Sequence, residues 1–130
     1  MRALIIDDSR AMRSILSRLM TGLGFEVITA SNGREGLERL REDDGIGLAL
    51  VDWNLPEMNG LEFVQSVRSD SSYDTIRLIM VSTETEKNRV IAALDAGVDE
   101  YVMKPFTGAI LSEKLAFLGL LPEDDEEQLG

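Results

Sequence analysis

The chain alternates between short apolar runs and longer stretches in which apolar residues recur every three or four positions. The continuous apolar runs span residues 3–6, 48–51, 78–81 and 101–103. Runs of this length without internal charges are typical of strands that are buried on both faces of a parallel sheet. Residues 25–30 form a fifth run that is more polar and partly alternating, which predicts a strand at the margin of the sheet.

The stretch after the first run carries one apolar stripe at the spacing of a buried helix face. The stripe consists of Met12, Ile15, Leu16, Leu19, Met20 and Leu23. Ser9 is the predicted N-cap of this helix, Gly22 or Gly24 its predicted end, and Asn32-Gly33 is predicted to open a second helix with Leu37 and Leu40 facing in. Three further helices are indicated by Leu61, Val64 and Val67, by Val90, Ile91 and Leu94, and by Leu111, Leu115 and Leu118.

Five alternations of strand and helix predict an α/β fold, namely a flavodoxin-like (βα)5 doubly wound parallel sheet with helices on both faces. With the strand order 2-1-3-4-5, the winding reverses between the first and third strands, and ligands bind there at the carboxyl ends of the strands. The first strand runs into Asp7-Asp8-Ser9-Arg10, which has neither a dinucleotide fingerprint nor a Gly-x-x-x-x-Gly-Lys loop. A Rossmann or P-loop enzyme is therefore not expected.

The composition narrows the chemistry further. With 130 residues, of which 44% are hydrophobic, the chain can form one compact core but hardly two ordinary domains. It has no cysteine and no histidine, which excludes zinc-finger ligands, thiol nucleophiles, disulfides and imidazole bases. We expect residues 1–118 to form the domain and residues 119–130, which contain the acidic run 123–127, to be a solvated tail.

The net charge and the short apolar runs bear on partners and location. A formal net charge of -11 opposes direct binding of nucleic acid, because Lys and Arg contacts to phosphate supply most non-specific affinity. No run is long enough for the core of a signal peptide or for a membrane span. The sequence thus predicts a soluble cytoplasmic protein without membrane contact.

Residues able to handle a cation or a phosphate follow four of the apolar runs. They are Asp7 and Asp8, Asp52, Ser82, and Lys104. In a parallel sheet they would meet at one edge, where the three carboxylates and one ammonium sum to about -2, a charge that a divalent cation cancels. Ligands that are all oxygen favour Mg²⁺. One carboxylate could then act as a nucleophile toward phosphorus, with Ser82 and Lys104 contacting the transferred phosphoryl group.

This set of motifs resembles the response-regulator receiver domains, and most closely the stand-alone chemotaxis regulators of the CheY type. The matching segments are Asp7-Asp8, residues 52–60, residues 81–84 and residues 101–106. The resemblance covers the chain from about residue 1 to residue 118 and implies a two-component phosphorelay protein. It also implies the strand order 2-1-3-4-5 and a cis peptide bond between Lys104 and Pro105.

The resemblance assigns a role to each site residue. Asp52 is expected to be the phosphoacceptor, with Ser82 and Lys104 completing the reacting site. Asp8, Asp52 and the backbone carbonyl of Asn54 are expected to ligate Mg²⁺, with Asp7 acting mostly through water. Ser82 and Tyr101 would form the switch, since Ser82 drawn to the phosphoryl group makes room for the Tyr101 ring to turn inward. Asn54 and Glu84 would set how fast the acyl phosphate hydrolyses, and a short-lived phosphoryl state is expected.

The implied partners are a histidine kinase or phosphotransfer protein as phosphodonor and a downstream protein, for which the flagellar switch is one candidate. The face formed by the fourth helix, fifth strand and fifth helix would bind that protein. Candidate contact residues there are Lys87, Val90, Tyr101, Met103 and Lys114. A monomer is expected, with no enzyme activity beyond its own phosphorylation and dephosphorylation.

Two other interpretations remain open at this point. The chain could be a receiver domain taken from a longer regulator or a hybrid kinase, or a Mg²⁺-dependent phosphohydrolase that uses the same aspartate. Against the second, 130 residues leave little chain for a domain that covers a substrate. Trp53, the single tryptophan, directly follows Asp52 and should report metal binding by its fluorescence.

Overall fold

The structure is a computed structural model of the chain and describes residues 1–83 and 87–121. Its strands are β1 (Arg2–Ile6), β2 (Glu26–Ala30), β3 (Ile46–Val51), β4 (Arg77–Ser82) and β5 (Glu100–Met103). Its helices are α1 (Arg10–Gly22), α2 (Gly33–Glu42), α3 (Gly60–Arg68), α4 (Lys87–Ala96) and α5 (Gly108–Phe117), with a short 3₁₀ turn η1 (Ser71–Tyr73) before β4. The strands form one parallel sheet in the order β2-β1-β3-β4-β5, which confirms the predicted fold.

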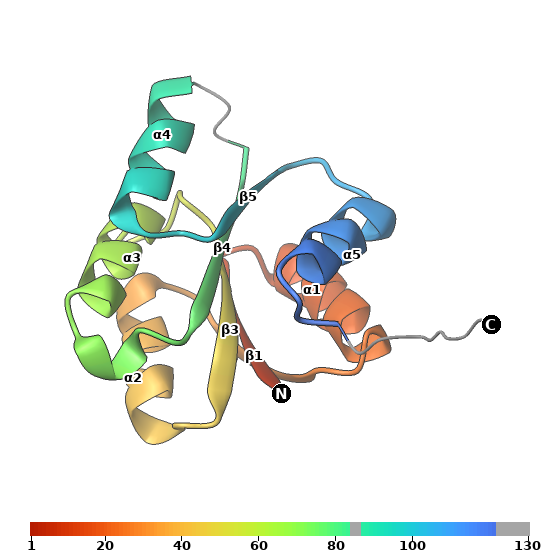
Figure 1. Ribbon diagram of the computed structural model, residues 1–130, viewed down its shortest axis with the longest axis horizontal. Helices are drawn as coiled ribbons and strands as arrows, with labels where there is room; N and C mark the ends of the chain where they lie inside the picture. Colours follow the sequence, from red (N-terminus) through yellow and green to blue (C-terminus); the bar gives the residue numbers. More distant parts are fainter. Residues whose placement is uncertain (84–86, 122–130) are drawn as a thin grey trace.

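The helices cover the two faces of the sheet unequally, with α1 and α5 on one side and α2, α3 and α4 on the other (Figure 1). Successive residues of the central strands therefore enter different cores. In β1, Leu4 and Ile6 pack toward α2–α4, whereas Ala3 and Ile5 pack toward α1 and α5. Both faces of the central strands are buried under helices, which explains why their sequences are apolar without alternation.

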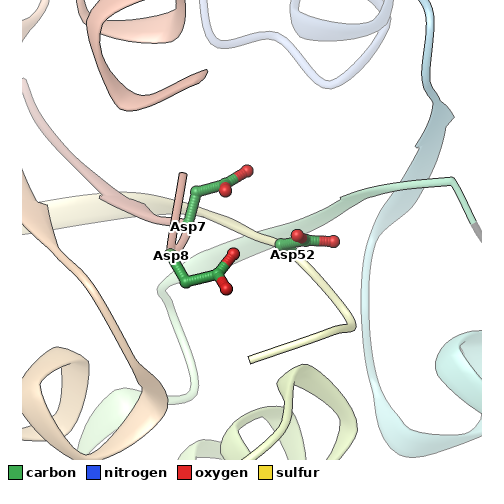
Figure 2. A group of neighbouring side chains, drawn as sticks. All are labelled: Asp7, Asp8 and Asp52. Carbon is green, nitrogen blue, oxygen red and sulfur yellow. The ribbon is translucent and has the colours of Figure 1, made fainter. Parts of the chain in front are cut away.

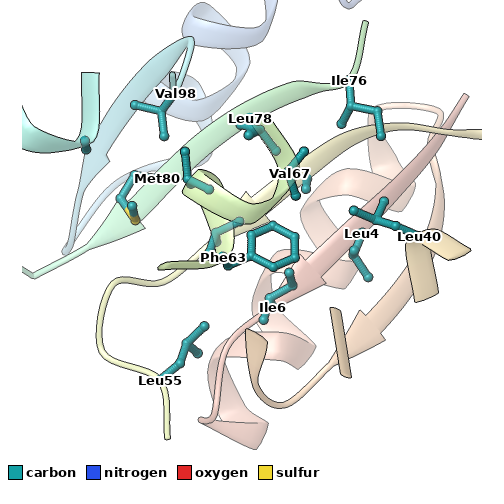
Figure 3. Packing of buried hydrophobic residues seen from close by; sticks show 14 of the residues in the cluster. Leu4, Ile6, Leu40, Leu55, Phe63, Val67, Ile76, Leu78, Met80 and Val98 are labelled. Carbon is teal, nitrogen blue, oxygen red and sulfur yellow. The ribbon is translucent and has the colours of Figure 1, made fainter. Parts of the chain in front are cut away.

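The larger core lies under α2, α3 and α4. Phe63 of α3 is fully buried there and lies close to Ile6 of β1, with Val67 and Leu78 in the same cluster (Figure 3). Burying one such aromatic or aliphatic side chain contributes roughly 1.5–3 kcal/mol to stability. This core sets the height of α3 above the sheet and, with it, the position of the loop that joins β3 to α3.

Polar caps fix the starts of the helices that follow the strands. The Ser9 side chain accepts a hydrogen bond from the Met12 N–H at 3.1 Å, which confirms the predicted N-cap of α1. Asn32 caps α2 in the same way, as predicted, and α1 ends at Gly22. Asn59 forms a capping box with Glu62 at the start of α3. Each cap is worth about 1 kcal/mol and fixes where a strand-end loop turns into a helix.

The apolar residues that predicted the helices do not all face the core. Ile15, included in the predicted stripe of α1, is exposed. In α4, Ile91 and Leu94 are 45% and 48% exposed, and the only fully buried residue of that helix is Ala93. A helix that approaches the sheet through a small residue presents a narrow buried strip, so its larger apolar neighbours stay outside.

Hydrogen bonds from one arginine hold the carboxyl end of α4 in place. Arg68, the last residue of α3, donates hydrogen bonds to the carbonyl oxygens of Gly97 at 2.9 Å and Ile76 at 2.8 Å. The same guanidinium pairs with Asp99 at 3.1 Å. Arg68 thus joins α3, the start of β4 and the turn after α4.

Among the described residues, no helix has both the length and the apolar character needed to span a bilayer.

Candidate functional site

Strand pairing brings the predicted site residues to one edge of the sheet. Asp7 and Asp8 follow β1, and Asp52 follows β3, which pairs with β1 so that Ile6 lies opposite Val51. The Asp52 N–H continues this pairing by donating to the Ile6 carbonyl at 3.0 Å. On the other side, the Lys104 N–H donates to the carbonyl of Ser82 at 2.9 Å. The carboxyl ends of four strands therefore meet where the winding of the sheet reverses.

Three carboxylates gather at this edge. One oxygen from each of Asp7, Asp8 and Asp52 lies within 4.8 Å of the others (Figure 2). Asp7 and Asp52 are buried, with 1% and 7% of their surface exposed, whereas Asp8 is open to solvent. Buried carboxylates this close repel one another unless a cation lies between them. The donors are all oxygen and one side of the cluster is open, so these residues fit Mg²⁺, which keeps part of its water shell.

Lys104 supplies the positive charge of the cluster. Its ammonium nitrogen lies 2.8 Å from Oδ2 of Asp7 and 3.4 Å from Oδ2 of Asp52. The Lys104 side chain is only 12% exposed, so these ion pairs are screened little by water. One lysine does not neutralise three carboxylates, and a charge of about -2 remains for a divalent cation.

The pKa of Asp52 is raised above its ordinary value of 3.8, chiefly because burial disfavours the charged carboxylate. The negative charge of Asp7 raises the pKa further. The positive charge of Lys104 and hydrogen bonds from Ser82 and the Asn54 N–H lower it, but do not outweigh burial. A desolvated carboxylate is a better nucleophile than a fully solvated one, provided that a cation keeps it ionised.

The remaining predicted residues take different positions. Ser82 is fully buried and hydrogen-bonds to Asp52, and the Asn54 N–H lies 3.4 Å from Oδ1 of Asp52. Tyr101 packs in the core under α2–α4 and is 7% exposed, so its ring is already turned inward. Glu84 lies outside the described residues. The predicted cis bond between Lys104 and Pro105 is confirmed.

The loop from Asp52 to Gly60 folds back on itself. The Gly60 N–H donates to the Trp53 carbonyl at 2.8 Å. A Cβ atom on Gly60 would lie 2.2 Å from the Asp52 carbonyl oxygen and 2.9 Å from the Trp53 Cα, far inside normal contact. The first residue of α3 must therefore be glycine for the helix to lie directly against the backbone of Asp52.

Trp53 links this loop to α4. Its ring is buried, and the guanidinium carbon of Arg89 lies 5.3 Å from the ring centroid. A cation at that distance over an indole contributes roughly 0.5–1 kcal/mol. The sequence identified Trp53 as a reporter but not its contact with Arg89, because no local spacing connects residues 36 positions apart.

Arg13 is a further residue that the sequence analysis missed. Its guanidinium donates a hydrogen bond of 2.8 Å to the backbone carbonyl of Asp7. One signal was present: α1 has no acidic residue in its first turn and begins with Arg10, although the amino end of a helix favours negative charge. That signal marks an unusual helix start without telling which arginine reaches back to the strand.

Comparison with known proteins agrees with this geometry. The chain matches the family described as response regulator receiver domain over residues 3–116. It is 47% identical over 116 residues to the chemotaxis protein CheY1 of Helicobacter pylori, covering 88% of this chain and 94% of that protein. A chemotaxis protein CheY homolog of Campylobacter jejuni is 45% identical over 116 residues, covering 88% of this chain and 89% of the relative.

Solved structures show the same fold. The chemotaxis response regulator CheY4 of Vibrio cholerae superposes with a TM-score of 0.83 at 32% sequence identity, covering 90% of this chain and 97% of that one. A CheY-like receiver domain protein of Methanospirillum hungatei gives a TM-score of 0.81 at 31% identity, covering 90% of this chain and 91% of that one.

Proposed function

Because the chain belongs to the family of response-regulator receiver domains and is homologous to CheY chemotaxis proteins, we propose that it is a phosphorylation-controlled switch whose phosphoacceptor is Asp52. The observation that carries this proposal is the cluster of Asp7, Asp8 and Asp52 with Lys104 at the carboxyl edge of the sheet. Asp52 is the central member, since it is close to both Lys104 and the Ser82 hydroxyl and lies at the point where the winding reverses.

In the proposed reaction, an Asp52 carboxylate oxygen attacks the phosphorus of a phosphohistidine or of a small phosphodonor. A P–O bond to Asp52 forms while the bond from phosphorus to the donor breaks, and the donor leaves with the electron pair of that bond. Mg²⁺, held by Asp8, Asp52 and the Asn54 carbonyl with Asp7 close by, would neutralise charge on the transferring group. Lys104 would pair with one phosphoryl oxygen and Ser82 would donate a hydrogen bond to another. Asn54 and Glu84 are the proposed determinants of the lifetime of the acyl phosphate.

The proposed output is a shift in the arrangement of α4, β5 and α5 when Ser82 moves toward the phosphoryl group. Support comes from five large apolar side chains that are exposed on these elements. They are Ile91 and Leu94 on α4, Met103 on β5, and Ile110 and Phe117 on α5. Of the predicted contact residues, Lys87 and Met103 are exposed and Lys114 is partly exposed, whereas Val90 is half-buried and Tyr101 is buried.

A histidine kinase or phosphotransfer protein is the proposed donor, and a protein of the motility apparatus is the proposed target, because the relatives named above are chemotaxis proteins.

The inward position of Tyr101 bears on the switch. Its burial makes the ring a core residue of the described structure, so Tyr101→Phe should preserve packing and Tyr101→Ala should not. A phosphorylated Tyr101→Phe protein that bound its partner as tightly as wild type would show that the hydroxyl takes no part.

Labelling with acetyl phosphate tests the proposal directly. We expect one phosphoryl group per chain in the presence of Mg²⁺, a mass increase that EDTA prevents and that Asp52→Asn abolishes. Asp95→Asn, at an exposed position on α4, is a matched control that should label like wild type. Unchanged labelling of Asp52→Asn would place the acceptor elsewhere, and sustained release of phosphate from a phosphate ester would favour a hydrolase.

A further inference from the structure

We propose that Arg13 is a positioning residue for the metal and phosphoryl site, acting through the backbone of Asp7 to which its guanidinium is bonded at 2.8 Å. This inference rests on the proposed function, because it concerns how the same acidic cluster is kept in the geometry that binds a cation. Arg13 itself touches neither Asp8 nor Asp52 by any hydrogen bond or ion pair among the described residues.

Every polar group of Asp7 is held by a different part of the fold. Its N–H donates to the Ala30 carbonyl at 3.2 Å, and its own carbonyl accepts from Arg13. Its Oδ1 accepts from the Ser9 N–H at 2.9 Å, and its Oδ2 pairs with Lys104 at 2.8 Å. Asp8, by contrast, is exposed and makes no hydrogen bond or ion pair within residues 1–83 and 87–121. Asp7 is thus the fixed member of the cluster, against which the other acids are placed.

The Arg13 bond matters because the Asp7 peptide lies where a strand becomes a helix. Residues 7 and 8 join the last residue of β1 to Ser9, the N-cap of α1, and the Asp7 carbonyl belongs neither to β1 nor to α1. Without the guanidinium, the Asp7 carbonyl loses the one hydrogen-bond donor that it has among the described residues, so the peptide between Asp7 and Asp8 is less constrained. A rotation of that peptide would displace Asp8 relative to the Asp7 carboxylate. Arg13 is suited to this task because it lies one helical turn after Ser9, so its side chain points back over the helix start.

The positive charge of Arg13 and its contact with the Asp7 backbone should affect Mg²⁺ binding in opposite directions. A second cation near the cluster repels Mg²⁺, so on charge alone the arginine should weaken binding of the metal. Glu35 and Arg39 line the same cavity of about 170 Å³ as Arg13, and the carboxylate of Glu35 offsets part of its charge. Residues that orient metal ligands commonly change metal affinity by about 10- to 100-fold when they are replaced. Position and charge therefore predict opposite signs, which makes the two roles separable.

The test compares Arg13→Gln with Arg10→Gln, which removes the same charge from the same helix. Arg10 is exposed and makes no hydrogen bond or ion pair in the described part of the chain, which makes it a matched control. Mg²⁺ dissociation constants are read from Trp53 fluorescence. We expect Arg13→Gln to weaken Mg²⁺ binding by about tenfold and Arg10→Gln to leave it unchanged or slightly tighter. Equal tightening by both substitutions would overturn the inference, because only charge would then be at work.

A second readout needs no metal. The Ser9 amide, whose hydrogen bond to Asp7 Oδ1 depends on the placement of that residue, is followed by NMR chemical shift and hydrogen exchange. Arg13→Gln should move this resonance and speed its exchange, whereas Arg10→Gln should not; an unmoved Ser9 amide in Arg13→Gln overturns the inference. Arg13→Lys, which keeps the charge but not the reach of the guanidinium, should behave like Arg13→Gln and serves if Arg13→Gln does not fold. Failure of the wild type to bind Mg²⁺ would count against the proposed function, while the Ser9 amide would still judge Arg13.

Discussion

The ammonium group of Lys104 lies closer to Asp7 than to Asp52, with distances of 2.8 Å and 3.4 Å to their Oδ2 atoms. Both carboxylates are buried, and burial raises the pKa of Asp52 although the charge of Lys104 lowers it. Lys104 therefore stabilises Asp7 most strongly and leaves Asp52 only partly compensated. This asymmetry suits a site in which Asp52 reacts and Asp7 stays a fixed anion.

Replacing Lys104 by Met should destabilise the metal-free protein. Breaking a buried ion pair by removing one partner typically costs 3–5 kcal/mol, and proton uptake by Asp52 should keep the loss near about 3 kcal/mol. Because Mg²⁺ supplies the missing positive charge, it should stabilise Lys104→Met more than wild type. Urea unfolding with and without Mg²⁺ measures both effects. Lys114→Met, which breaks the partly exposed pair with Glu100, should cost under about 1 kcal/mol in the same assay.

The pH dependence of stability should differ between wild type and Asp52→Asn in the absence of metal. The folded-state pKa of Asp52 is raised, so the unfolded chain releases this proton at a lower pH than the folded protein does. The Asp52 carboxyl consequently costs stability as pH rises through and beyond its ordinary value, and the cost is constant above the folded pKa. Asp52→Asn removes this cost. We expect the two proteins to unfold alike near pH 3.5 and the variant to be more stable at pH 7; a less stable variant at pH 7 would contradict the raised pKa.

Gly60→Ala should damage the site through the backbone. The added methyl group meets the Asp52 carbonyl oxygen at 2.2 Å, and neither the start of α3 nor the strand end can yield without moving Asp52. We expect a loss of more than about 2 kcal/mol in the free energy of unfolding and weaker Mg²⁺ binding by Trp53 fluorescence. Gly22→Ala, at the end of α1, is the control and should be close to neutral, because the new methyl group meets no atom of the described residues within 4 Å beyond its chain neighbours and the backbone of its own helix.

The sequence was sufficient to predict the sheet and the composition of the acidic cluster because both follow from local patterns. Continuous apolar runs identify strands buried on two faces, and the residue after each run lies at the carboxyl edge whatever the details of packing. The strand order, which the resemblance to receiver domains supplied, then brings Asp7, Asp52 and Lys104 together at that edge. The contacts of Arg13 with Asp7 and of Arg89 with Trp53 depend instead on where helices lie relative to the sheet, which no residue spacing encodes.

Helix α4 shows that an apolar pattern can predict a helix without predicting which of its residues are buried. Val90, Ile91 and Leu94 predicted a helix, and the helix is present, but its buried residue is Ala93. Hydrophobicity marks a helix that has an apolar side without telling whether that side meets the sheet or a partner.

The tail after residue 121 lies outside the described residues, and the division into a domain of residues 1–118 and a tail of residues 119–130 stays a prediction.

Two substitutions in α4 distinguish a residue that packs in the core from a residue on the surface of the helix. Ala93 is fully buried against the sheet, so Ala93→Leu should overpack the core and lower the free energy of unfolding by about 1–3 kcal/mol. Leu94→Ala removes as many carbon atoms as that change adds, but from a half-exposed position, and should cost less than about 1 kcal/mol. If the exposed side of α4 contacts a partner, Leu94→Ala should instead weaken binding of the phosphorylated protein, measured by titration calorimetry. Equal stability losses in the two variants would mean that α4 packs on the sheet through Leu94 as well.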